Sequence, residues 1–182
     1  MPVEEWMGLG GLVVRQLTGP EVVEFCLDKV VEFQIAQWEM IIDKMGDYFQ
    51  IVRISDDLGT QNAPIMSPDT YRELIKPRQK RIVDYIKSRN PDIKIIYHCD
   101  GAVLEFLPDI VEIGFDAWNP VQVTADGIDD TARLQREFGD KICFWGAGCD
   151  SQQVIARATP EGIRAGGRRR INDLADGGGP GL

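Results

Sequence analysis

Three side chains with reactive groups follow a short apolar segment near the middle of the chain. Residues 93–97 read IKIIY, and His98, Cys99 and Asp100 come directly after them, followed by Gly101. A short run of β-branched and aromatic residues indicates a strand that is buried on both faces. Because strand side chains alternate, we expect His98 and Asp100 on one face and Cys99 on the other. Gly101 allows the backbone to turn tightly at this point.

His98 is the only histidine among the 182 residues, and with Asp100 it offers two kinds of site. A His-x-Asp pair at the carboxyl end of a strand can form half of a metal site or take part in acid–base catalysis. The alternative is a structural histidine that is hydrogen-bonded to a neighbouring loop. The residues alone leave these interpretations open.

Composition narrows the class of protein. Hydrophobic residues make up 43% of the chain and charged residues 27%, which is typical of a globular protein with a core. The net charge of −9 argues against general binding to nucleic acid or to an anionic membrane. No segment resembles a membrane span, and Glu4 and Glu5 stand where a signal peptide would be positively charged, so we expect a cytoplasmic protein.

The four cysteines do not indicate a disulfide framework, because the chain has no CxxC pair and is not rich in cysteine. Cys26 falls in a helical pattern and Cys143 in an apolar strand, so both are expected to be packing residues. Cys99 and Cys149 lie at strand ends and remain candidates for chemistry.

Helices and strands alternate along the sequence. Helix-start signals with proline at the first helical position precede residues 20–45, 68–89 and 160–174, and Pro77 is expected to kink or split the second of these helices after Lys76. Further helices are expected at 104–113 and 129–138. Strands are expected at 49–54, 93–97, 115–118 and 141–145. This alternation predicts an α/β fold with a parallel sheet of four βα units.

Polar side chains follow each expected strand. They are Asp56 and Asp57, then His98 and Asp100, then Asn119 and Gln122, and finally Cys149 and Asp150. Active sites of (β/α)8 barrels, or TIM barrels, are built from such strand ends. The pattern therefore predicts an incomplete TIM barrel of about four consecutive units.

Arg53 interrupts an apolar strand. If the strand is buried, leaving this charge unpaired would destabilise the fold by roughly 3–5 kcal/mol, the cost of breaking a buried ion pair. It is expected either to pair with a carboxylate inside the fold or to reach the barrel mouth and hold an anionic substrate. Adjacent strand residues point in opposite directions, so Asp56 and Asp57 are not expected to share a proton. One would face the mouth while the other caps a helix or pairs with a base, or both would simply close a βα loop.

Three segments resemble the uroporphyrinogen decarboxylase superfamily. They are ISDDLGTQNAPIMSP, YHCDGAVLEFLPDIVEIGFDAWNPVQ and FWGAGCDSQQV, at residues 54–68, 97–122 and 144–154. The resemblance extends from about Pro20 to Gly179. It implies a (β/α)8 barrel and either of two activities, since the superfamily includes porphyrinogen decarboxylases and zinc-dependent methyltransferases that act on corrinoid proteins.

The resemblance also implies that the chain is one domain over residues 1–182 that matches the second half of the barrel and is truncated at both ends. TIM barrels need about 250 residues. Residues 1–18 are expected to form a weakly structured lead-in and 177–182 a frayed tail. Half a barrel has two open edges, which favours aggregation or pairing with another half. A homo-oligomer is one such arrangement.

The first expected function is metal-dependent methyl transfer with a corrinoid protein. Methyltransferases of the superfamily bind zinc through a His-x-Cys pair and a later cysteine. By this resemblance His98 takes the histidine position, Asp100 takes the second position, and Cys149 becomes the third ligand if its loop bends over the mouth. A carboxylate is a harder ligand than a thiolate, so such a site would also accept other divalent ions.

The alternative function is decarboxylation of uroporphyrinogen, a small-molecule substrate that the resemblance implies is processed without a metal. The essential aspartate of that branch lies outside the matched region. The expected catalytic residues here are Asp56, Asp57 and His98, and those expected to contact substrate are Arg53, Asn119 and Gln122. A third possibility is an inactive fragment that completes a barrel with a partner.

Overall fold

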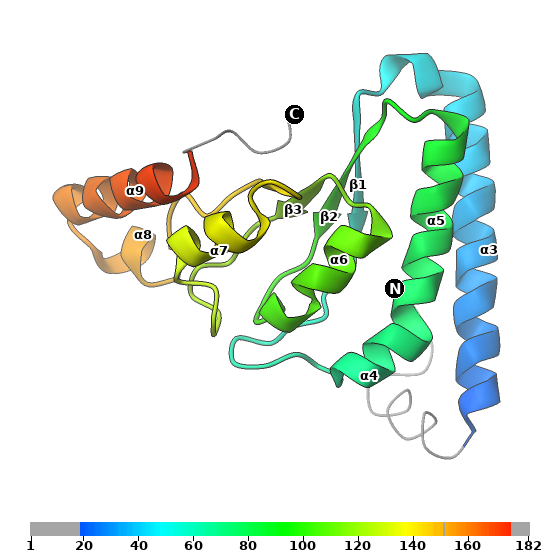
Figure 1. The fold of residues 1–182 in the computed structure, drawn as a ribbon, viewed down its shortest axis with the longest axis horizontal. Helices are drawn as coiled ribbons and strands as arrows, with labels where there is room; N and C mark the ends of the chain where they lie inside the picture. The colour runs from blue at the N-terminus through cyan, green and yellow to red at the C-terminus, as the bar shows by residue number, and fades with distance from the viewer. Residues whose placement is uncertain (1–18, 151, 176–182) are drawn as a thin grey trace. The chain divides into compact units, whose positions relative to one another are not determined.

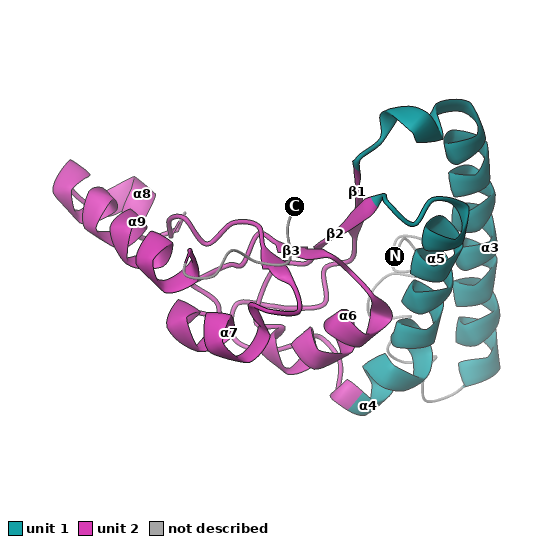
Figure 2. Ribbon diagram, turned by 45° about the horizontal axis from the view of Figure 1, so that its top comes forward, with its two compact units in different colours: residues 1–50, 69–93 teal, residues 51–68, 94–182 magenta. Residues whose placement is uncertain are grey.

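The computed structural model describes residues 19–150 and 152–175. The expected lead-in at 1–18 and the tail at 177–182 lie outside the described residues. The chain divides into two compact units, Met1–Gln50 with Asp69–Ile93 and Ile51–Pro68 with Lys94–Leu182 (Figure 2). Each unit is described separately below. No helix among the described residues is long and apolar enough to cross a membrane.

The first unit is built on two long helices, α3 (Pro20–Met45) and α5 (Lys76–Arg89), which run side by side (Figure 1). The bounds of α3 confirm those predicted from the sequence. Apolar residues at helical spacing are buried on α3, and a matching set is buried on α5. They are Val23, Leu27, Val30 and Val31, together with Ile82, Val83 and Ile86. A short 3-10 turn, η1 (Gly46–Tyr48), follows α3.

The helix expected at 68–89 changes type along its length. It comprises α4 (Pro68–Thr70), the π-helix η2 (Tyr71–Ile75) and α5. At the end of η2 the backbone N–H of Lys76 donates to the carbonyl of Tyr71, five residues earlier. The predicted disturbance at Pro77 is therefore a widened turn just before the proline, which has no N–H of its own to donate.

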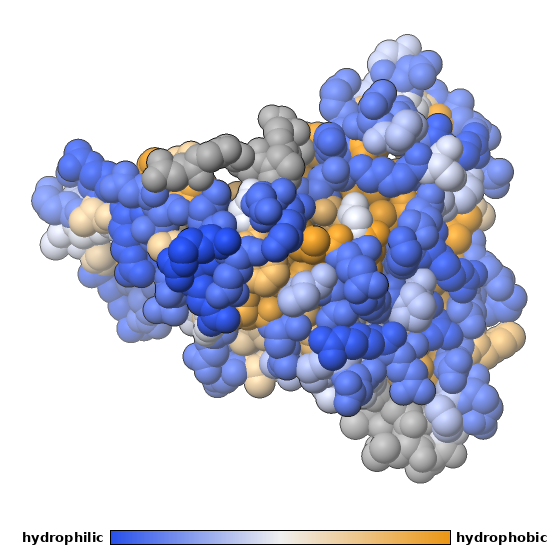
Figure 3. Space-filling model, viewed as in Figure 1, coloured by the Kyte–Doolittle hydropathy of each residue, from blue (hydrophilic) through white to orange (hydrophobic). Residues whose placement is uncertain are grey.

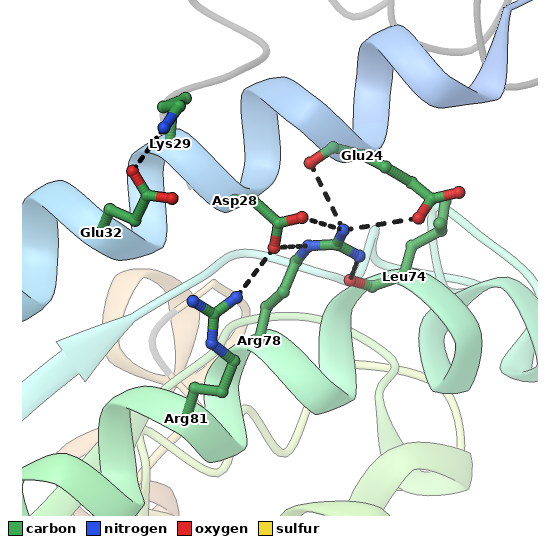
Figure 4. Close-up of polar contacts among 7 residues, drawn as sticks. All are labelled: Glu24, Asp28, Lys29, Glu32, Leu74, Arg78 and Arg81. Atoms are coloured by element: carbon green, nitrogen blue, oxygen red, sulfur yellow. Dashed lines mark hydrogen bonds and ion pairs between the residues drawn. The ribbon is translucent and has the colours of Figure 1, made fainter.

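Arg78 joins the two helices through polar contacts (Figure 4). Arg78 is only 6% exposed. Its Nε and Nη2 atoms donate to the two carboxylate oxygens of Asp28, each at 3.1 Å, and Nη1 donates to the carbonyl of Leu74 at 2.8 Å. This guanidinium holds the pKa of Asp28 below its ordinary value. The bidentate geometry is the one in which arginine binds carboxylates best.

The second unit contains a parallel sheet in the order β1-β2-β3-β4. The strands are β1 (Ile51–Ser55), β2 (Lys94–His98), β3 (Ala117–Asn119) and β4 (Cys143–Phe144). The four-stranded parallel sheet with its helices confirms an α/β fold consistent with part of a TIM barrel. Each strand overlaps the range expected from the sequence; β2 has the expected length, and β1, β3 and most clearly β4 are shorter.

Helical segments of this unit follow β2, β3 and β4 (Figure 1). They are η3 (Leu104–Phe106), α6 (Leu107–Ile113), α7 (Thr131–Phe138), α8 (Val154–Arg157) and α9 (Pro160–Leu174). Helix α6 ends at Gly114 with φ 101°, a left-handed conformation that suits glycine. The side chains of Asp130 and Thr159 cap α7 and α9 by accepting the N–H groups of Arg133 and Gly162. Helix α8 was not predicted.

The sheet register defines two faces. One face carries a row of residues that are paired across the four strands: Arg53, Ile96, Ala117 and Cys143. Two residues closer to the carboxyl ends, the same face carries a second row, formed by Ser55, His98 and Asn119. On the opposite face Ile95, Tyr97 and Trp118 are fully buried. Figure 3 shows mostly hydrophilic side chains on the visible surface, with apolar side chains between them.

Candidate active site

His98 lies at the end of β2 in the middle of the sheet, and both ring nitrogens have partners. Its Nδ1 lies 2.6 Å from Oδ1 of Asn119, and its Nε2 lies 3.3 Å from Oδ2 of Asp100. Asn119 reaches this position because β3 is in register with β2 and pairs it directly with His98. The second amide atom of Asn119, Nδ2, donates to the carbonyl of Trp145.

The partners of Asn119 determine which ring nitrogen carries a proton. An amide oxygen only accepts hydrogen bonds, so Nδ1 of His98 must be the donor in this contact. Nε2 then faces the carboxylate of Asp100. An ionised carboxylate is also only an acceptor, so Asn119 and Asp100 are both satisfied when the ring carries a proton on each nitrogen, and Nε2 then forms an ion pair with Asp100. The site therefore presents one nitrogen that can exchange a proton or bind a metal.

A second carboxylate joins this pair. Among the described residues, ligand atoms of Asp57, His98 and Asp100 lie within 4.8 Å of one another. Oδ1 of Asp57 also accepts the backbone N–H of Asp100 at 3.4 Å. Asp57 comes from the loop after β1, so the group is assembled from the ends of two neighbouring strands, as in TIM-barrel active sites.

The donor set fits a divalent cation of hard or borderline character. Imidazole nitrogen and carboxylate oxygen are ordinary zinc ligands, and two ligands about 2.0–2.1 Å from a tetrahedral ion lie roughly 3.4 Å apart. The 3.3 Å between Nε2 of His98 and Oδ2 of Asp100 is compatible with that spacing. Asn119 would hold the other ring nitrogen, which is the usual support for a metal-binding histidine.

Cys149, the expected third ligand, is not part of this group. The backbone of its loop is drawn toward β3, where the N–H of Ala147 donates to the carbonyl of Pro120 at 2.9 Å. Cys149 instead lines a cavity of about 320 Å³ together with Asp100, Gln122 and Asp150. The third ligand atom near His98 and Asp100 comes from the carboxylate of Asp57.

Asp56 and Asp57 differ in their surroundings, as alternation along the chain predicted. The side chain of Asp56 is buried, at 5% exposure, while Asp57 is exposed. The backbone N–H of Asp56 donates to the carbonyl of His98 and so extends the pairing of β1 with β2. Of the two aspartates, only Asp57 belongs to the group around His98.

Arg53 is exposed on β1, so the desolvation that the sequence interpretation assumed is not observed. The strand lies at the edge of the sheet, where one face meets solvent, and an exposed charge needs no internal partner. Its side chain lies on the same face as His98, two residues further from the carboxyl end. The position is compatible with the predicted role in holding an anionic group.

Cys99 points away from His98 and is completely buried. Its sulfur accepts the backbone N–H of Leu58 at 3.4 Å. Burial raises the pKa of the thiol to about 12. A thiol held in its neutral form is a poor nucleophile, so Cys99 is a packing residue and not part of the site.

Contacts among loop amides were missed by the sequence interpretation. Gln122 accepts the N–H of Gly101 at 2.9 Å and donates to the side chain of Gln61 at 2.9 Å. Gln61 also accepts from Gln152 at 3.2 Å. The order of the strands along the chain was the only available signal for these contacts, because it predicts that the loops after neighbouring strands adjoin.

The sequence pattern of the family described as uroporphyrinogen decarboxylase (URO-D) matches residues 13–180, nearly the whole chain. The chain belongs to the uroporphyrinogen decarboxylase family. The geometry agrees with this membership, since the site lies at the carboxyl ends of parallel strands. No solved structure matched the chain significantly.

Several curated relatives carry the family name. A uroporphyrinogen decarboxylase of Synechococcus sp. is 27% identical over 169 residues, which cover 88% of this chain and 42% of that protein. One of Prochlorococcus marinus is 31% identical over 140 residues, covering 70% of this chain and 35% of the relative. One of Chloroherpeton thalassium is 30% identical over 106 residues, which cover 56% of this chain and 26% of that protein. The chain thus spans between 26% and 42% of the length of these relatives.

Proposed function

We propose that this chain takes part in the decarboxylation of an acidic tetrapyrrole of the uroporphyrinogen class. The observation that carries the proposal is the match of the family over residues 13–180, together with relatives that are named uroporphyrinogen decarboxylase. The residues at the ends of β1, β2 and β3 supply the groups that this chemistry needs at one edge of the sheet.

Decarboxylation breaks a bond between carbon and a carboxylate, and the electron pair left on carbon must take up a proton. His98 is suited to carry that proton, because Asn119 fixes its ring and directs Nε2 toward the carboxylate of Asp100, which can share the proton with it. Carboxylates such as Asp57 accept the N–H groups of pyrrole rings and stabilise positive charge on a protonated ring. The guanidinium of Arg53, on the same sheet face, would bind a side-chain carboxylate of the substrate.

The proposal is tested with the purified chain and uroporphyrinogen under anaerobic, reducing conditions. Chromatography after oxidation counts the carboxylates that remain on each product. We expect products with fewer carboxylates, no effect of a chelator, and a rate at least about 100-fold lower for His98→Gln, the usual range for loss of a general acid or base. Cys26→Ser, remote in sequence and on α3, serves as the matched control. Absence of both turnover and porphyrin binding would reject the proposal for this chain.

A second candidate is metal-dependent methyl transfer with a corrinoid protein, and the group of Asp57, His98 and Asp100 favours it. Bound there, a divalent ion would lower the pKa of a thiol or similar acceptor and supply the nucleophile at neutral pH. The test is zinc content after dialysis against zinc, compared between the native chain and His98→Ala. Equal zinc in the two proteins would dismiss this candidate.

A further inference from the structure

We propose that Gln122 is a positioning residue that fixes the turn after β2 and thereby sets the carboxylate of Asp100 against His98. Sequence reasoning had assigned Gln122 to substrate contact. The inference concerns the geometry of the group around His98, and it rests on the proposed function only in treating that group as a site.

Three consecutive backbone N–H groups in this turn have three different acceptors. The N–H of Asp100 donates to the carboxylate of Asp57 at 3.4 Å, and the N–H of Gly101 donates to Oε1 of Gln122 at 2.9 Å. The N–H of Ala102 donates to the carbonyl of Thr60 at 2.8 Å. The loops after β1 and β3 therefore both hold the turn, and among these three acceptors Gln122 is the one that follows β3.

The middle of the turn has no room for adjustment. Gly101 has φ 84°, a conformation that other residues rarely adopt, and a Cβ atom there would lie 2.4 Å from the carbonyl carbon of Gly59. The backbone of the turn thus lies directly against the loop after β1. Because the turn is packed this closely, a shift of Gly101 would also move Asp100, the residue before it. The carboxylate of Asp100 lies 3.3 Å from Nε2 of His98.

The side chain of Gln122 is itself fixed. Its Nε2 donates to Oε1 of Gln61 at 2.9 Å and approaches Oγ1 of Thr124 at 3.4 Å. Gln61 is held in turn, because its own Nε2 donates to the carbonyl of Thr124. Both ends of the Gln122 amide are occupied by protein groups. Such an amide holds the loops in place.

The test uses the fact that the chain has a single histidine, so imidazole signals in an NMR spectrum report on His98 alone. Gln122→Met keeps the length of the side chain and removes both polar ends. We expect the Gly101 amide to exchange about tenfold faster, the loss that corresponds to one ordinary hydrogen bond. We also expect the imidazole resonances to shift or broaden. Neither readout requires substrate, so failure of the proposed activity would not affect them.

Two further variants separate positioning from general stability. Gln152→Met is the matched control, since it removes a contact to the same oxygen of Gln61 without touching Gly101. It should leave both readouts unchanged. Gln122→Glu keeps an acceptor for the N–H of Gly101, and exchange there should return to within about threefold of the native rate. Gln122→Asn, which is one methylene shorter, replaces the methionine variant if that protein does not fold.

The proposal is overturned if Gly101 exchange and the His98 signals are the same in the native chain and in Gln122→Met. It is also overturned if Gln152→Met changes them to the same extent, because the effect would then be a general loosening of the loops. The thermal unfolding midpoint of each variant, measured in parallel, shows whether a change at His98 is local.

Discussion

At the scale of single residues, the surroundings of His98 determine what the site can do. Asn119 binds one ring nitrogen as an acceptor, and Asp100 faces the other. A histidine that is oriented in this way has its Nε2 directed at the carboxylates of Asp57 and Asp100. Proton transfer and metal binding both require that arrangement, so the two candidate functions make the same demand on Asn119.

We predict that Asn119 sets the tautomer of His98. In the native chain the neutral ring should carry its proton on Nδ1, because the contact of Nδ1 with Oδ1 of Asn119, at 2.6 Å, is shorter than the contact of Nε2 with Asp100, at 3.3 Å. In Asn119→Leu the acceptor is lost and the proton should move largely to Nε2. Nitrogen-15 NMR of labelled histidine distinguishes the two forms. Asn119→Asp keeps an acceptor and should preserve the native tautomer; a native ring protonated on Nε2 would contradict the prediction.

Cys99 leads to a prediction about alkaline pH. Burial raises its pKa from 9.0 to about 12, so between these values the unfolded chain loses the proton and the folded chain keeps it. The stabilisation is fully present below pH 9.0 and is lost as pH rises toward 12. The free energy of unfolding should fall by about 1 kcal/mol per pH unit in this range. Denaturant titrations at several pH values measure the slope, which should be flatter for Cys99→Ala than for the native chain.

Part of the site could be predicted from the sequence at this scale. Strand alternation placed His98 and Asp100 on one side and Cys99 on the other, and the structure shows that arrangement. The contact of His98 with Asn119 depends on the register between β2 and β3, which no local pattern specifies. The place of Cys149 depends on how a glycine-containing loop folds back, and loops of this kind have many accessible conformations.

At the scale of elements, α3 and α5 are joined by a cluster of polar contacts as well as by their packed apolar side chains (Figure 4). Arg78 is almost completely buried and binds Asp28 through two nitrogens. Arg81 donates to the same carboxylate at 2.8 Å. Without Asp28, the buried guanidinium keeps only the longer ion pair with Glu24, at 3.7 Å, so most of the cost of burying its charge is no longer offset.

We therefore predict that Asp28→Ala destabilises the protein more than Arg78→Met does. The first variant should lower the free energy of unfolding by about 2–3 kcal/mol and the second by about 1 kcal/mol, since it leaves a half-exposed carboxylate that Arg81 still binds. Denaturant titration at neutral pH measures both. Lys29→Ala is the control: its ion pair with Glu32 is exposed on the same helix and should be worth less than about 0.5 kcal/mol. A larger loss for Arg78→Met would contradict the prediction.

Element positions followed from the sequence where local signals were strong. Proline at the first helical position and apolar residues at helical spacing predicted α3 with its bounds. Strand ends were less accurate, because hydrogen bonding to a neighbouring strand decides where a strand stops, and β4 shortens to two residues. Helix α8 has only four residues, Val154–Arg157, which is too few for a periodic pattern to appear.

At the scale of the whole chain, the sheet has two outer edges. Within residues 19–150 and 152–175, β1 pairs only with β2, and β4 pairs only with β3. Both outer strands therefore present backbone groups that another strand could bind. On β1, Ile51 is 38% exposed, so this edge strand also presents an apolar side chain to solvent.

The last prediction follows from these edges: the 182-residue chain on its own should associate, and Ile51→Lys should reduce the association. A lysine at an edge strand opposes pairing with another strand, because the pairing would bury its charge. Size-exclusion chromatography with light scattering, at several protein concentrations, measures the mass. Phe25→Lys is the control, since Phe25 is 62% exposed on α3, away from the sheet in sequence. If Phe25→Lys abolished association and Ile51→Lys did not, the contact would lie on α3; a native chain that stays monomeric at every concentration would contradict the prediction altogether.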